Sequence, residues 1–128
     1  MAHILVVDDE EHLRSIYEQY LTHDGHTVST ADNGLTAIKL LKHNHFDLVI
    51  TDIVMPEQDG LGLLNELRKL ADAPPVIVIS GGSLRLDSHH LLSLAKVMKA
   101  HATLTKPVSY EQLHTAVDTV LSQSKIPA

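Results

Sequence analysis

The feature that most restricts the fold is an alternation, repeated five times, between short apolar runs and segments with helical periodicity. In the helical segments, apolar residues recur at spacings of three and four, as on the buried face of a helix. The run at 48–51 does not alternate with polar residues, which is typical of a strand covered on both faces. The expected strands are 4–7, 27–30, 48–51, 76–79 and 102–105. Five such units predict an α/β protein, a doubly wound (βα)5 three-layer sandwich around a parallel five-stranded sheet.

The length of 128 residues fits one domain, and a hydrophobic content of 44% is enough for a core. Aromatic residues make up only 3% of the chain, so aliphatic side chains must fill that core. We expect residues 1–122 to form the domain and residues 123–128 to form a short C-terminal tail. An output domain is not expected, because no residues are left to build one.

Composition excludes several classes of protein. No stretch approaches the roughly 18 apolar residues that a membrane span needs, and no secretory signal is visible. The chain contains no cysteine and has a net charge of −6, which argues against a nucleic-acid partner. We therefore expect a cytoplasmic protein without a membrane partner. Its ten histidines follow no metal-binding pattern and are interpreted as surface residues.

Chemically active residues follow four of the predicted strands at the point where each strand ends. They are Asp8 and Asp9 after the first strand, Asp52 after the third, Ser80 after the fourth and Lys106 after the fifth. The carboxyl ends of the strands of an open parallel sheet share one crevice. The sequence therefore predicts that three carboxylates, a hydroxyl and an ammonium group converge there.

Three neighbouring carboxylates repel one another, and a hard divalent cation removes that repulsion. Mg²⁺ prefers oxygen ligands, keeps several waters and shares its remaining positions with phosphate oxygens. We expect Asp9 and Asp52 to be direct ligands, with the backbone carbonyl of Val54 as a third. Asp8 would act mainly through water.

An aspartate carboxylate can also accept a phosphoryl group and form an acyl phosphate. Asp52 is central in the predicted cluster and is assigned as the acceptor. Lys106 is assigned to hold the phosphoryl oxygens, and Ser80 to donate a hydroxyl hydrogen bond to them. We expect no enzyme in the usual sense, because the protein would catalyse only its own phosphorylation and dephosphorylation.

Four segments in this order resemble the receiver domain of response regulators, the CheY-like family, in its stand-alone single-domain form. They are VVDDE at 6–10, TDIVMPEQDG at 51–60, VIVIS at 76–80 and TKP at 105–107. The resemblance covers essentially the whole chain, and the ordered set is specific although each motif alone is weak.

The resemblance implies a flavodoxin-like sheet of order 2-1-3-4-5 and a cis peptide bond between Lys106 and Pro107. It also implies Mg²⁺-dependent phosphorylation of Asp52 by a sensor histidine kinase or a histidine phosphotransfer protein. A cis bond before proline costs only about 0.5–1 kcal/mol, so a fold can impose it.

The chain departs from the family at two places. The family usually has an aromatic switch residue three positions before the lysine, where this chain has Thr103. The segment Gly81–His101 is also a few residues longer than in many receivers. We therefore predict that Ser80 still moves toward the phosphoryl group. Activation would be expressed mainly in the loop at Gly81 and Gly82 and at the start of the helix that follows, with little change at Thr103.

Several alternatives remain open. A flavodoxin-like binding module would need an anion-binding loop where this chain has an acidic run at 8–11. An aspartyl-phosphate hydrolase normally has a second aspartate at the position of Val54. A third alternative is a scaffold that is never phosphorylated. If the receiver interpretation holds, we expect a monomer or weak dimer. The protein would bind an unidentified downstream protein, relay the phosphoryl group or drain it from a shared kinase.

Overall fold

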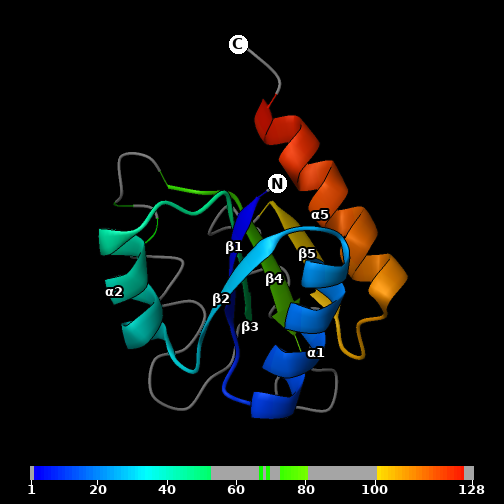
Figure 1. Cartoon of the computed structure of the whole chain (residues 1–128), viewed down its shortest axis with the longest axis horizontal. Helices are drawn as coiled ribbons and strands as arrows, with labels where there is room; N and C mark the ends of the chain where they lie inside the picture. The colour runs from blue at the N-terminus through cyan, green and yellow to red at the C-terminus, as the bar shows by residue number, and fades with distance from the viewer. Residues whose placement is uncertain (1, 53–66, 68, 70–72, 81–100, 126–128) are drawn as a thin grey trace.

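The computed structural model describes residues 2–52, 67, 69, 73–80 and 101–125. The strands are β1 (His3–Val7), β2 (Thr27–Ala31), β3 (Leu48–Asp52), β4 (Val76–Ser80) and β5 (Ala102–Thr105). The helices are α1 (Glu11–His23), α2 (Gly34–His43) and α5 (Tyr110–Lys125) (Figure 1). The two helices that the sequence predicts between β3 and β4 and between β4 and β5 lie outside the described residues, apart from isolated positions.

All five strands are parallel and form one sheet in the order β2-β1-β3-β4-β5. This result confirms the predicted fold class and strand order. Most strands are one residue longer than their apolar runs, because backbone pairing continues to the edge of the sheet. Asp52 pairs with Ile79, and Ser80 pairs with Thr105. In β3 and β4 the extra residue is therefore the polar one at the carboxyl end of the strand, Asp52 and Ser80.

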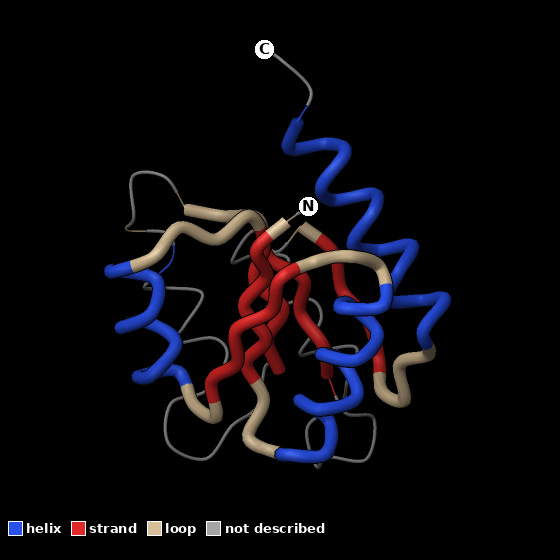
Figure 2. Tube along the Cα trace, in the orientation of Figure 1, coloured by secondary structure: helices blue, strands red, loops and turns tan. Residues whose placement is uncertain are grey.

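Helices cover both faces of the sheet, with α2 on one face and α1 and α5 on the other (Figures 1 and 2). Successive residues of a strand point to opposite faces, so each strand contributes to two cores. In β1, Leu5 and Val7 lie in the core under α2, whereas Ile4 and Val6 lie in the core under α1 and α5. Every residue of β3 is buried, as its apolar run predicts.

Helix α5 continues to Lys125, beyond residue 122, where the domain is expected to end. Val120 and Leu121 are buried and fix this end of the helix on the core. The next three residues have no glycine or proline to stop the helix, and the first such residue is Pro127. Among the described residues, none of the helices combines the length and apolar character that a bilayer crossing requires.

Several histidines have a structural role that the surface interpretation missed. Imidazole nitrogens of His26 and His101 accept hydrogen bonds from the backbone N–H groups of Ala2 and Val76, at 3.3 and 3.2 Å. These N–H groups lie at the amino ends of strands, where the sheet offers a backbone donor fewer partners. The histidines therefore satisfy backbone groups at the edge of the sheet remote from the acidic cluster.

Candidate functional site

The carboxyl edge of the sheet brings two aspartates and a lysine into contact. Asp8 follows β1, Asp52 ends β3 and Lys106 follows β5. Lys106 Nζ donates a hydrogen bond to Asp52 Oδ2 at 2.9 Å. It also lies 3.4 Å from Asp8 Oδ2 and 3.6 Å from Glu10 Oε2. The Lys106 ammonium group therefore faces three carboxylates. Two of them follow β1, and the third ends β3.

The two aspartates that contact Lys106 are buried, with only 1% of Asp8 and 6% of Asp52 exposed. Asp8 Oδ1 accepts a hydrogen bond of 2.9 Å from the Glu10 N–H group. Arg14 Nη1 donates to the Asp8 carbonyl oxygen at 2.7 Å, which joins the first turn of α1 to the end of β1. These contacts fix the backbone around Asp8 and the orientation of its carboxylate.

Burial and charge shift the pKa values of this cluster in opposite directions. Burial raises the pKa of Asp8 to about 6, although the Glu10 N–H group and Lys106 oppose the rise. Burial alone would lower the pKa of Lys106, but the hydrogen bond and charge of Asp52 outweigh it and raise that pKa. Lys106 therefore stays positively charged, while Asp8 bears its charge at an energetic cost.

The cluster has the composition of a site for a hard cation. Carboxylate oxygens of Asp8, Asp9 and Asp52 all lie within 4.8 Å of one another. Asp8 Oδ2 is buried and accepts no hydrogen bond from the residues that the structure describes, and Asp9 is exposed to solvent. An all-oxygen donor set with an unsatisfied buried oxygen and an open side fits Mg²⁺.

Two of the predicted site residues fall at the border of the described structure. Ser80 is the last residue of β4, where its backbone pairs with Thr105, the residue before Lys106. Its backbone therefore lies at the same edge of the sheet as the acidic cluster, and its predicted hydroxyl role stays a prediction. Val54 lies outside the described residues, so its carbonyl ligand also stays a prediction.

The other two predicted residues belong to β5 and the connection after it. Thr103 is half-buried in the middle of β5 and pairs with Val78 of β4. The peptide bond between Lys106 and Pro107 is cis. Among the described residues, the carboxylates in contact with Lys106 are those of Asp8, Glu10 and Asp52, so the role of Thr103 as a switch position stays a prediction.

Sequence reasoning assigned no role at the site to three residues that the structure places around it. Glu10 contacts Lys106, and Arg14 holds the backbone of Asp8. Tyr17 of α1 is 2% exposed, and burial raises its pKa to about 12, while the charge of Lys106 opposes the rise and that of Asp8 adds to it. The acidic run at 8–11 could have indicated that Glu10 lies near the site. For Arg14 and Tyr17, the sequence indicates only a position on the first helix.

A buried aspartate that ends a central parallel strand, beside two further aspartates and a lysine, is the arrangement that defines a receiver domain. Residues 4–118 match the model of the response regulator receiver domain family. The chain therefore belongs to the response regulator receiver domain family, whose members are the receiver domains of two-component response regulators.

Similar proteins agree with this assignment. The chain is 35% identical over 123 residues to the transcriptional regulatory protein GlrR of Escherichia coli K12, covering 96% of this chain and 27% of GlrR. It is 30% identical to the response regulator SaeR of Staphylococcus aureus, covering 98% of this chain and 53% of SaeR. The chain thus spans about half or less of these relatives.

Solved structures share this fold. A response regulator receiver domain protein from Clostridium thermocellum superposes with a TM-score of 0.87 at 30% identity, covering 98% of both chains. The receiver domain of a Francisella response regulator superposes with a TM-score of 0.84 at 28% identity, covering 98% of this chain and all of that one. Both likenesses extend over all five strands and the three described helices.

Proposed function

We propose that this receiver domain accepts a phosphoryl group on Asp52 in a reaction that depends on Mg²⁺. The observation that carries the proposal is the buried Asp52 carboxylate, held 2.9 Å from Lys106 Nζ beside Asp8 and Asp9. A sensor histidine kinase or a histidine phosphotransfer protein would donate the phosphoryl group. The modified domain would then act through a downstream protein partner, or pass the group on.

The residues divide the chemistry between them. A carboxylate oxygen of Asp52 forms the new bond to phosphorus while the bond between phosphorus and the leaving group breaks, and the leaving group takes that electron pair. Lys106 stays charged and is placed to neutralise the oxygens of the incoming group. Asp8, Asp9, Asp52 and the Val54 carbonyl would hold Mg²⁺, which neutralises negative charge on the phosphoryl group when bound.

The function is tested with acetyl phosphate as a small phosphodonor. With millimolar Mg²⁺, the protein should gain one phosphoryl group, observed as intact mass and lost on treatment with hydroxylamine. With a chelator instead of Mg²⁺, the gain should fall by at least ten-fold, because one ammonium group cannot balance both the carboxylates and the phosphate. If no label appears under either condition, the protein is a scaffold that is not phosphorylated.

Metal binding is tested separately by thermal unfolding. A ligand that binds only the folded state stabilises it by roughly 1.4 kcal/mol at ten times its Kd, which raises the Tm by several degrees in a chain of this size. We expect this shift in the wild type, and a much smaller one in Asp9→Asn. The exposed Asp118→Asn variant on α5 is the matched control and should keep the full shift. Equal shifts in all three proteins would remove the proposed site.

A further inference from the structure

A second cluster of titratable side chains joins the C-terminal end of α1 to the first turns of α5. Asp24, the residue that caps α1, accepts two hydrogen bonds from α5. The Tyr110 hydroxyl donates to Asp24 Oδ1, and His114 Nδ1 donates to Asp24 Oδ2 at 2.8 Å. The partners lie 86 and 90 positions away from Asp24 along the chain. Only 14% of the Asp24 side chain is exposed, compared with 45% of His114.

Aromatic contacts surround these two hydrogen bonds. The rings of Tyr110 and His114 stack, with centroids 5.6 Å apart and planes at 25°. The Tyr110 ring also meets His23 and Tyr20 of α1 edge to face, at 5.8 and 5.5 Å. Both geometries are within the favourable range for ring pairs. Tyr110 is therefore held by α1 through its hydroxyl and through its ring.

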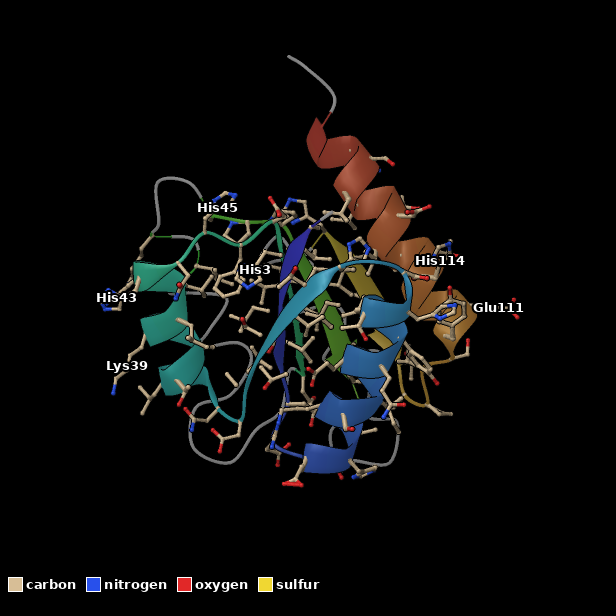
Figure 3. All side chains as sticks on the ribbon, in the orientation of Figure 1. His3, Lys39, His43, His45, Glu111 and His114 are labelled. Carbon is tan, nitrogen blue, oxygen red and sulfur yellow. The ribbon has the colours of Figure 1, made fainter. Side chains whose placement is uncertain are left out.

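Hydrogen bonds within the cluster shift the pKa values of His114 and Asp24 in opposite directions. The hydrogen bond from His114 to Asp24 raises the pKa of His114, and the charges of Asp24 and Asp118 add to the rise. Burial alone would raise the pKa of Asp24, but the bonds from Tyr110 and His114 and the charge of His23 outweigh it and lower that pKa. The other charged group on this turn of α5 is Glu111, which is exposed (Figure 3).

The sign of the pH effect follows from these two shifts. A raised His114 pKa means that the contact is strongest when the imidazole is charged, and that it weakens as pH rises through the folded-state value. A lowered Asp24 pKa means that the contact also weakens when pH falls into the carboxyl range. The contact is therefore strongest at mildly acidic pH, between these two transitions.

We propose that Asp24, Tyr110 and His114 form a pH-sensitive latch, which holds the first turns of α5 against the end of α1 and loosens as the His114 imidazole loses its proton. The latched turn begins at Tyr110, four residues after Lys106, and Val108, between them, is buried. The latch thus restrains the segment that joins α5 to the acidic site, although none of its three residues belongs to that site.

The test uses the full chain and one neutral variant, His114→Gln, whose amide can still donate to Asp24 but does not titrate. The exposed His43 of α2 is the control, because it lies across the sheet from His114 (Figure 3). NMR titration should give His114 a higher pKa in the wild type than in Asp24→Asn, because that variant removes the charge of the hydrogen-bond acceptor.

Amide hydrogen exchange then tests whether the contact holds the helices. Protection factors at residues 110–117 reflect local opening and should fall about two- to five-fold in the wild type between pH 5.5 and 8.5, the effect expected of one exposed ion pair. His43→Gln should behave as the wild type, and His114→Gln should show no such fall. A His114 pKa that Asp24→Asn leaves unchanged would overturn the latch, and so would a raised pKa with unchanged protection.

Discussion

The Asp52→Asn variant is expected to gain no phosphoryl group from acetyl phosphate. An amide oxygen carries no negative charge and the amide nitrogen lone pair is delocalised, so the side chain is not a nucleophile. Asparagine has nearly the shape of aspartate, and its oxygen can still accept the hydrogen bond from Lys106, which lies 2.9 Å from Asp52 Oδ2. The fold is therefore expected to survive, and loss of labelling would reflect loss of the acceptor.

The control is Asp118→Asn, which makes the same chemical change at an exposed position of α5. It should be labelled at the wild-type rate, and its label should be equally sensitive to hydroxylamine. Mass spectrometry of the intact protein and of its peptides measures both rate and position. If Asp52→Asn is labelled as fast as the wild type, the acceptor lies elsewhere, and Asp8 and Asp9 become the first candidates.

Much of the fold follows from the sequence because burial and hydrophobic pattern are tightly linked. The uninterrupted apolar run of β3 predicts a strand covered on both faces, and all its residues are buried. Alternating strands and helices predict a parallel sheet but do not determine which strands are neighbours. The order came from the family resemblance, and β2-β1-β3-β4-β5 confirms it.

The acidic cluster could be predicted because parallel strands end at one edge, whatever their separation in the sequence. This reasoning alone places Asp8, Asp52 and Lys106 together, and the structure brings them into contact. It could not predict the contact of Arg14 with the Asp8 carbonyl oxygen, since that contact depends on how the first turn of α1 begins.

The latch was also beyond sequence reasoning. Nothing in the sequence around Asp24 points to Tyr110 or His114. Their contact depends on the relative placement of α1 and α5, which is set by packing on the shared core. Membership of the receiver family now disfavours the flavodoxin-like binding module, while relay, direct binding and phosphate drainage stay open predictions.

The second large effect concerns stability without metal, where Asp8→Asn should make the protein more stable. Asp8 is 1% exposed, its Oδ2 accepts no hydrogen bond among the described residues, and burial raises its pKa to about 6 from an ordinary value of 3.8. A shift of two pKa units corresponds to about 3 kcal/mol of unfavourable free energy for the charged form. Asparagine removes that charge, and its oxygen can still accept the hydrogen bond from the Glu10 N–H group.

The pKa of Asp8 is higher in the folded state than in the unfolded state. Its contribution to the stability of the fold is therefore fully present below about pH 4 and is lost as the pH rises through about 6. The Asp8 pKa already includes the attraction between Asp8 and Lys106, so we expect a gain of about 3 kcal/mol at pH 7.5 and almost none near pH 4. Urea unfolding in the presence of a chelator measures both values, and exposed Asp118→Asn should stay within about 0.5 kcal/mol of the wild type. A variant that is less stable than the wild type at pH 7.5, or a gain that shrinks as pH rises, would show that the Asp8 charge supports the metal-free fold.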